Sequence, residues 1–397
     1  MSPSAVEERR ALVVLLSVIF LMIAGFGLVI PLLPFFAQAF HAPAWQVTLL
    51  FSAFSVGQFL GEPFWGKLSD RVGRKPVLIV TITAVGVSYA GLAFAPNLIS
   101  AFIVRFLCGI FAGNISTLQG AMTDITPPDK RASRMGILGA AFSAGFTAGP
   151  AIGGFLAQPS RGALGFQLPL LVAAGFAIAS AVAVVAFVRE SRPERPALLG
   201  PKPARLREGF AHPIISRVVV ISFIVVVGFA GVEATYGLWT ETRFGWGPLQ
   251  IGFAFMAMGV LGAVCQGWLC GRLARRYGEP TTLTFGLGFM GLGLATQGVA
   301  PVWPVAMLGF ALVCIGQSIC FPNIAALISQ AAPSHRQGEM LGLNMSGMAL
   351  ARIGGPVLAG QLFSLVATGA PFAFSALLIL PALVFAMQIR RRTPLAA

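Results

Sequence analysis

The chain has 397 residues, of which 56% are hydrophobic and only 10% are charged. Soluble globular domains carry about 25% charged residues, so this composition excludes a protein whose whole surface faces water. The formal net charge of +14 would suit a nucleic-acid partner. The basic residues, however, lie mainly in short segments between apolar runs, which argues against nucleic acid.

Apolar runs near 20 residues long recur along the chain, and about 20 residues is the length with which a helix crosses a bilayer core. The runs lack the alternation of strands, and helices satisfy their own backbone hydrogen bonds in lipid. The sequence therefore predicts an all-α membrane protein with twelve transmembrane helices. The expected spans are 11–36, 45–65, 76–95, 98–122, 134–157, 165–188, 214–238, 250–271, 281–300, 303–329, 338–363 and 370–389.

A signal peptide is an alternative interpretation of the first apolar run. From residue 11 to residue 36 it is far longer than the roughly 7–15 residues of a signal core. We therefore interpret it as the first membrane helix.

One connection is longer than the others. Residues 189–213, "RESRPERPALLGPKPARLREGFAHP", are rich in Pro and Arg and are typical of a solvated linker. The segment is too short and too polar to bury a core, so a small folded domain is disfavoured. We expect an N-terminal six-helix bundle at 1–188, a cytoplasmic linker at 189–213 and a C-terminal six-helix bundle at 214–397.

The distribution of basic residues predicts the orientation. With the N-terminus inside, all but four of the 27 Lys and Arg residues lie at the cytoplasmic face, where the positive-inside rule places them. The exceptions are Arg161 and Arg243 outside and Arg105 and Arg352 within spans. Both termini are therefore expected in the cytoplasm. The positive charge reflects topology and attraction to anionic membrane lipid.

Signals of a cofactor or of catalysis are missing from the sequence. The five cysteines all fall in apolar runs, without metal-ligand spacing, and are expected to be free thiols that pack as small apolar groups. No phosphate-binding loop of the form G-x-x-x-x-G-K-[ST] and no catalytic triad is present. The sequence thus predicts no metal, no cofactor and no enzyme, and leaves ion coupling as the energy source of any transport.

The two halves repeat. "GKLSDRVGRKPVL" at 66–78 aligns with "GRLARRYGEPTTL" at 271–283 at an offset of 205. Paired six-helix halves are typical of transporters in which one half rocks against the other around a midplane site. The second copy has Arg275 in place of Asp70 and Glu279 in place of Arg74, so we expect its charge pattern to be degraded.

Twelve spans, a basic central linker and the pattern G-x-L-S-D-R-x-G-R-K-P between the second and third spans resemble the major facilitator superfamily. Gly66 is expected to let two helix ends approach, and Gly73 to form a turn that a Cβ would resist. Asp70 is suited to the N-terminus of a facing helix, and Asp124 is an expected partner of Arg74. The resemblance implies an inner gate made by Gly66, Asp70, Arg71, Gly73, Arg74 and Asp124. A merely basic loop would explain the Lys and Arg residues but not Asp70 or the glycines.

The fifth span contains "GFTAGPAIGG", which resembles the antiporter motif of drug-exporting members, G-x-x-x-G-P-x-x-G-G. Glycines four residues apart let helices meet backbone to backbone, and the proline should bend its helix. Ordinary small-residue packing is the alternative. The resemblance favours an antiporter over a symporter, with the motif at Gly145, Gly149, Pro150, Gly153 and Gly154.

Ionisable residues within spans are costly and therefore candidates for function. Arg105 opens "RFLCG", which resembles the family's R-x-x-Q-G with Cys108 in place of the Gln. Helical spacing puts Arg105 and Gln119 on one face and Asn114 on the other. A carboxyl can carry a proton when its surroundings change. Glu62 could instead pair with a gate residue, and Glu233 could lie near the outer surface. The candidates for proton coupling or cargo binding are Arg105, Glu233, Glu62, Gln58, Gln119 and Arg352.

"GAMTDITPPDKRA" and "LWTETRFGWGPLQIG" resemble the tetracycline efflux branch of the drug:H⁺ antiporters. The resemblance implies a monomer in a bacterial inner membrane that exports small amphipathic drugs, tetracycline-like or multidrug, in exchange for protons by alternating access. An ion-coupled importer or facilitator of a sugar or organic acid remains an alternative, although the spans are sparse in polar residues. A non-transporting membrane sensor is a second alternative, although its gate motif would be expected to degrade.

Overall fold

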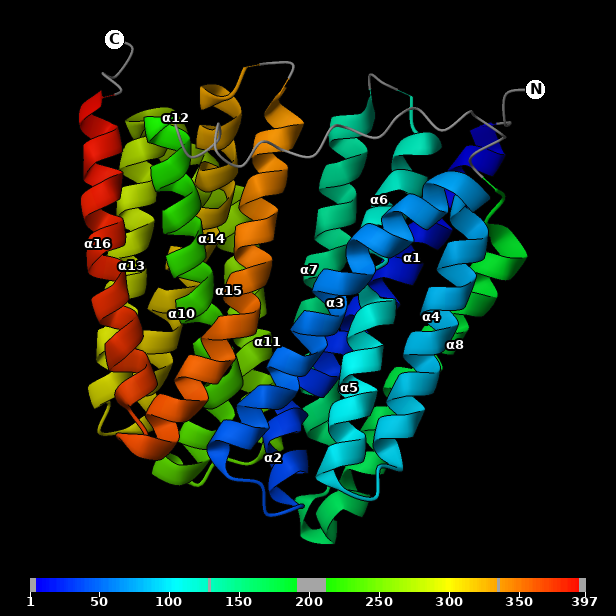
Figure 1. Cartoon of the computed structure of the whole chain (residues 1–397), viewed down its shortest axis with the longest axis horizontal. Helices are drawn as coiled ribbons and strands as arrows, with labels where there is room; N and C mark the ends of the chain where they lie inside the picture. The colour runs from blue at the N-terminus through cyan, green and yellow to red at the C-terminus, as the bar shows by residue number, and fades with distance from the viewer. Residues whose placement is uncertain (1–4, 128–129, 191–211, 334–335, 393–397) are drawn as a thin grey trace. The chain divides into compact units, whose positions relative to one another are not determined.

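The computed structural model describes residues 5–127, 130–190, 212–333 and 336–392, and every regular element in these ranges is helical. Figure 1 shows the helices in chain order. The N-terminal helices are α1 (Ala5–Val29), α2 (Leu33–Gln38), α3 (Ala44–Val72), α4 (Arg74–Ala93), α5 (Leu98–Ala112), α6 (Ile115–Asp124), α7 (Arg131–Leu156) and α8 (Gln167–Phe187). The C-terminal helices are α10 (Pro213–Phe244), α11 (Pro248–Val264), α12 (Gly271–Tyr277), α13 (Glu279–Val299), α14 (Trp303–Ala331), α15 (Gln337–Leu365) and α16 (Ala370–Arg392).

The predicted all-α membrane architecture is confirmed. Among the described residues, ten helical stretches are long and apolar enough to cross a membrane. The other two predicted spans, 45–65 and 281–300, fall in α3 and α13, which have 29 and 21 residues. At 1.5 Å per residue, either is long enough for a bilayer core of about 30 Å. The five cysteines are free and buried, as expected.

Two predicted spans are broken rather than continuous. The first consists of α1, a short 3₁₀ turn at Ile30–Leu32, and α2, with Pro31 and Pro34 at the joints. Proline lacks an N–H and cannot continue the hydrogen-bond ladder. The fourth span is interrupted at residues 113–114, between α5 and α6. The expectation that one helical face carries both Arg105 and Gln119 assumed an unbroken helix there, and the break removes that basis.

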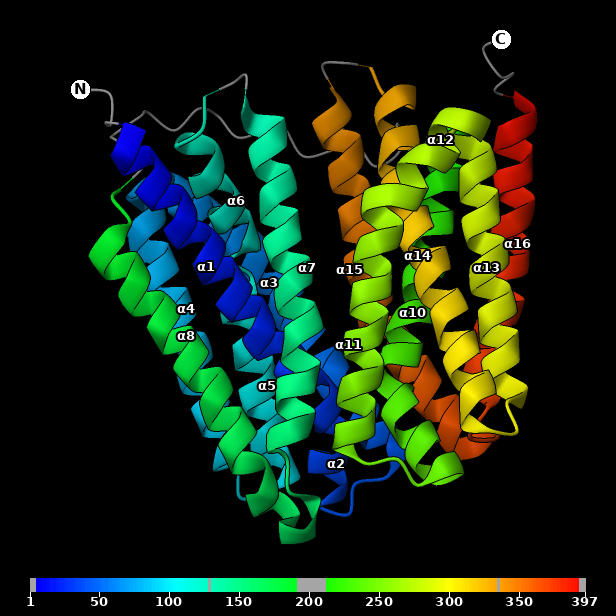
Figure 2. The same ribbon diagram turned by 180° about the vertical axis from the view of Figure 1, so that it is seen from behind.

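The described residues form two compact units. Within the described residues, unit 1 comprises 5–42, 50–127, 130–190 and 246–259, and unit 2 comprises 43–49, 212–245, 260–333 and 336–392. In unit 1, α1 packs on α7 and α8, and α4 packs on α5 and α8. In unit 2, α10 packs on α15 and α16, and α13 packs on α14 and α16. The pairing follows the same order in both, and Figure 2 shows α4 beside α8 and α13 beside α16. This agreement supports the internal repeat.

Within unit 1, α3 and α5 meet backbone to backbone. A Cβ on Gly57 or Gly61 would collide with the backbone of α5, at Phe106 and Ile110. A Cβ on Gly109 would likewise collide with the backbone of α3. The close crossing fixes the end of α3 near α6, which follows α5, and this placement brings the charged motif together. The boundaries 1–188 and 214–397 stay a prediction, and most of the expected linker at 189–213 lies outside the described residues.

Candidate functional site

The charged motif is built around a helix break at a single glycine. Residues 66–72, expected to lie in a loop, form the last turns of α3, and α4 begins at Arg74. Gly73 between them has φ 102° and ψ 161°, a conformation that residues with a Cβ rarely adopt. The sequence correctly assigned the turn to this glycine. The loop itself is reduced to one residue because α3 continues through the motif.

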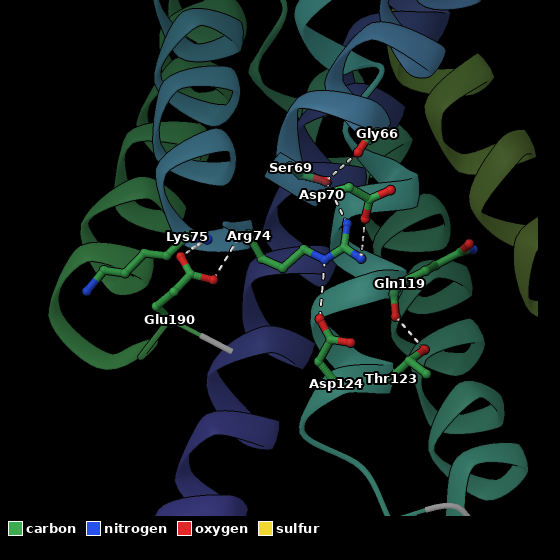
Figure 3. Close-up of polar contacts among 9 residues, drawn as sticks. All are labelled: Gly66, Ser69, Asp70, Arg74, Lys75, Gln119, Thr123, Asp124 and Glu190. Carbon is green, nitrogen blue, oxygen red and sulfur yellow. Dashed lines mark hydrogen bonds and ion pairs between the residues drawn. The ribbon is translucent and has the colours of Figure 1, made fainter. Parts of the chain in front are cut away.

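Arg74 lies at the centre of the polar contacts in unit 1 (Figure 3). Its Nη2 is 2.9 Å from Asp70 Oδ1, and its Nε is 3.3 Å from Asp124 Oδ2. Its Nη1 donates a hydrogen bond of 2.6 Å to Ser69 Oγ, which in turn donates to the carbonyl of Gly66 at 2.8 Å. The predicted pair between Arg74 and Asp124 is therefore present. One guanidinium joins α3, α4 and α6.

The burial of Arg74 favours stronger ion pairs than a fully exposed arginine would form. The side chain of Arg74 is 13% exposed, whereas that of Asp70 is 53% exposed. Burial of the arginine reduces solvent screening, and charge-assisted bonds to ionised partners are stronger than neutral ones. A Cβ on Gly120 of α6 would lie 2.7 Å from Arg74 Cζ. The missing side chain at Gly120 thus leaves room for the guanidinium to lie against α6.

A further carboxylate, which the sequence pattern did not predict, accepts hydrogen bonds from the start of α4. Glu190 Oε1 accepts a hydrogen bond from the backbone N–H of Arg74 at 2.8 Å, and Oε2 accepts one from Lys75 at 3.0 Å (Figure 3). The first N–H groups of a helix lack partners within the helix, and the helix dipole favours a negative charge there. Lys75 Nζ also donates to the carbonyl of Val185 in α8 at 2.9 Å. The end of α8 and the start of α4 are therefore joined.

One signal could have found Glu190. Gly73 precedes the first residue of α4 and has no side-chain oxygen with which to cap the helix. The acceptor must come from elsewhere in the chain, and a carboxylate at the end of a neighbouring helix suits it. Glu190 lies in residues 189–213, whose composition indicates a solvated linker rather than a helix cap. A Cβ on Gly73 would lie 2.5 Å from Glu190 Oε2, so this glycine also makes room for the carboxylate.

Two of the expected gating residues have looser surroundings. Arg71 is exposed at the end of α3. A Cβ on Gly66 would meet only Ser116 Oγ, at 3.4 Å. This is an ordinary contact with α6, whereas the closest backbone contacts of α3 lie earlier, at Gly57 and Gly61, so the role of Gly66 in helix approach stays a prediction.

The glycines of the antiporter-like motif are buried and pack against two helices, α1 and α11. Cβ atoms on Gly145, Gly149 and Gly153 would collide with successive turns of α1, between Phe20 and Leu28. A Cβ on Gly154 would instead collide with the carbonyl of Pro248, in the part of α11 that belongs to the same unit. Pro150 is accommodated inside α7. The motif thus packs α7 tightly against α1, and its role in antiport stays a prediction.

The candidates for coupling or cargo binding differ in their surroundings. Arg105 is 2% exposed, and its guanidinium lies 4.5 Å from the centre of the Phe54 ring. Asn114 is buried and donates to Thr81 Oγ1 at 2.9 Å, which fits its predicted packing role. In unit 2, Glu233 of α10 lies within electrostatic reach of Arg352 of α15. Gln58 is partly exposed, and the exposed residues among the candidates are Glu62, Gln119 and Arg352.

Comparison with known proteins places these features in a family. The chain matches the Major Facilitator Superfamily over residues 15–295 and 244–396. It is 29% identical to tetracycline resistance protein, class B, of Escherichia coli, covering 86% of this chain and 85% of that protein. It is 29% identical to multidrug resistance protein 2 of Bacillus subtilis (strain 168), covering 92% of each.

A solved structure resembles the chain over almost its whole length. The human organic anion transporter MFSD10 (TETRAN) matches with a TM-score of 0.69 and 26% identity, covering 96% of this chain and 99% of that one. The family match, the apolar helices and the repeated packing of the two units agree. The chain belongs to the Major Facilitator Superfamily, and it is a multi-pass membrane transporter rather than an enzyme.

Proposed function

We propose that this transporter exports small amphipathic drugs in exchange for protons, by alternating access in a bacterial inner membrane. One observation carries the proposal: the similarity to a tetracycline resistance protein and a multidrug resistance protein extends over most of the chain. We further propose that it acts as a monomer with both termini in the cytoplasm.

In this mechanism the contacts of Arg74 act as the inner gate. Movement of α3 relative to α6 has to break the bonds from Arg74 to Asp124 or to Asp70, because the one guanidinium holds both carboxylates. The ion network of Arg74 is therefore suited to two states of the gate, one with the ion pairs formed and one with them broken. The tight packing of α7 on α1 supplies a rigid element against which such movement can occur.

Proton coupling is assigned to Glu233. This carboxyl is partly buried in α10, and Arg352 on the neighbouring α15 is near enough to change its preference between the charged and neutral forms. Glu62 is exposed and is the weaker candidate. Movement of Arg352 toward or away from Glu233 would give a proton-binding and a proton-releasing state.

A second candidate function is the transport of organic anions. It is favoured by the 26% identity to the human organic anion transporter over 96% of this chain. Both candidates use the same fold, and they differ in the charge of the cargo.

The experiment that tests the proposal uses inside-out vesicles with an acidic interior and a pH-sensitive dye. Tetracycline is added first, then a panel of lipophilic cations and amphipathic anions. We expect cargo-dependent alkalinisation of the lumen, which Asp70→Asn abolishes while the protein level stays normal. No response to any member of the panel, with the protein present, would contradict proton-coupled drug export and favour a metabolite carrier.

A further inference from the structure

Arg105 carries a buried positive charge whose bonding capacity is only partly used. Its side chain is among the largest fully buried ones in the chain, with the residue 2% exposed. Among the described residues, neither Nε nor Nη1 has a hydrogen-bond partner. Buried polar groups in native proteins nearly always have partners, and an unsatisfied charged group is especially costly. Such a group calls for an explanation.

Arg74 in the same unit has the ion-pair and hydrogen-bond partners that Arg105 lacks among the described residues. It is more exposed than Arg105, yet it bonds two carboxylates and a hydroxyl. The titratable groups near Arg105 are the thiol of Cys108 and the hydroxyl of Tyr89, and neither is a carboxylate. No carboxylate of the described residues forms an ion pair with Arg105. The more deeply buried of the two cations is thus the one without a counter-ion.

The surroundings of Arg105 are aromatic as well as cationic. The Phe54 ring beneath the guanidinium lies 5.2 Å from the ring of Phe26, at an interplanar angle of 34°. Phe26, on α1, is partly exposed, so the two rings extend from the buried guanidinium toward the surface of unit 1. Rings in this arrangement suit the flat apolar body of a ligand.

We propose that Arg105 binds an anionic group, a carboxylate in the first instance, on an amphipathic aromatic cargo whose ring system packs on Phe54 and Phe26. A guanidinium offers several donors that match the geometry of a carboxylate, and the free Nε and Nη1 supply two of them. The proposal rests on the transport function above and gives its cargo a charge class. It assigns Arg105 a direct role in cargo recognition.

The test measures binding and is independent of transport. Purified protein in detergent is titrated with 1-naphthaleneacetate, with its uncharged analogue 1-naphthaleneacetamide, and with acetate alone. A ligand that binds the folded state raises the unfolding temperature in a concentration-dependent way, so affinities follow from thermal unfolding. We expect naphthaleneacetate to bind more tightly than the amide, and acetate to have little effect because it lacks the ring system.

The variant Arg105→Gln separates charge recognition from apolar binding. It should weaken naphthaleneacetate binding about tenfold or more, the size expected for losing charged hydrogen bonds, while amide binding stays within about twofold. Arg161→Gln, which removes an exposed arginine of the same unit, is the matched control and should change neither. Arg105→Lys keeps the charge without the fork geometry and should give an intermediate loss of preference. It also serves as the test if Arg105→Gln does not fold.

The proposal would be overturned by equal binding of the two naphthalene ligands to the wild-type protein, by no binding of naphthaleneacetate at millimolar concentration, or by an unchanged preference in the Arg105 variants. Stabilisation by acetate equal to that by naphthaleneacetate would also overturn it, since the site would then be a simple anion site. Failure of the vesicle assay alone, with Arg105-dependent binding retained, would count against proton-coupled export and leave anion recognition standing.

Discussion

The two copies of the charged motif share a backbone and differ in their side chains. Gly73 in unit 1 has φ 102° and ψ 161°, and Gly278 in unit 2 has φ 76° and ψ 158°. Each glycine ends one helix and begins the next, with a break of one residue. The turn is therefore a common structural requirement of the repeat. Glycine is required in both copies because of this backbone.

The side chains around the two turns follow different patterns. In unit 2, Glu279 replaces the arginine that follows the glycine, and Arg275 replaces the aspartate before it. Glu279 Oε1 accepts a hydrogen bond of 3.1 Å from Gln330. Among the described residues, a single side-chain hydrogen bond thus stands at Glu279, where the first copy has the ion pairs of Arg74. The comparison teaches that the turn and the charged network are separable, and gating by the first copy stays a prediction.

The largest difference is expected from removal of the charge that follows each glycine. Arg74→Ala should lower the initial transport rate in vesicles to below about a tenth of wild type, because it leaves two carboxylates without their shared partner. Glu279→Ala should keep at least about half of the rate, since it removes one exposed hydrogen bond. Arg74→Lys, which keeps the charge but loses the fork, should fall between them. Equal losses in Arg74→Ala and Glu279→Ala would mean that both copies gate.

Replacement of the glycines themselves should affect stability in both units. Gly73→Ala and Gly278→Ala each place a Cβ at positive φ with ψ near 160°, a region almost confined to glycine, which costs about 1–3 kcal/mol. Gly73→Ala should cost more, because its Cβ also displaces the Glu190 carboxylate from the start of α4. Thermal unfolding of the purified variants measures the difference. A larger loss for Gly278→Ala would show that the Glu190 contact does not constrain the first turn.

Much of this architecture could be predicted from the sequence because its signals are local. Apolar runs of spanning length predicted the helices, and the offset of 205 between the motif copies predicted the repeat. The pair between Arg74 and Asp124 was also accessible, since both charges lie at the inner ends of expected spans. These features depend on composition, spacing and the sides of the membrane.

The missed features depend on contacts between distant segments. Glu190 reaches the start of α4 across 116 residues, and no local pattern links the two. The break at residues 113–114 coincides with the close approach of α3, where a Cβ on Gly113 would lie 2.5 Å from the backbone nitrogen of Glu62. Helical periodicity cannot be carried through that break to place Gln119 relative to Arg105. Tertiary packing decided each of these cases.

A smaller effect is expected from Glu190→Gln. The amide keeps one oxygen acceptor but brings its own N–H groups toward the donors of Arg74 and Lys75, so one of the two bonds at the start of α4 is lost. The transport rate should fall about two- to threefold. Glu190→Asp, which keeps the charge on a shorter side chain, is the matched control and should retain more of the rate. An unchanged transport rate in Glu190→Gln would show that transport does not depend on the charge of this carboxylate.

The smallest effect is expected from Gln330→Ala, which removes the hydrogen bond to Glu279 in the second copy. That bond is exposed, and exposed substitutions of this kind change stability by no more than about 0.5 kcal/mol. The transport rate and the unfolding temperature should both stay close to wild type. A loss approaching that of Arg74→Ala would mean that this single hydrogen bond does in unit 2 what the ion network does in unit 1. The hydrogen bond between Gln330 and Glu279 would then compensate for the missing ion network in the second copy, and both turns would belong to the gate.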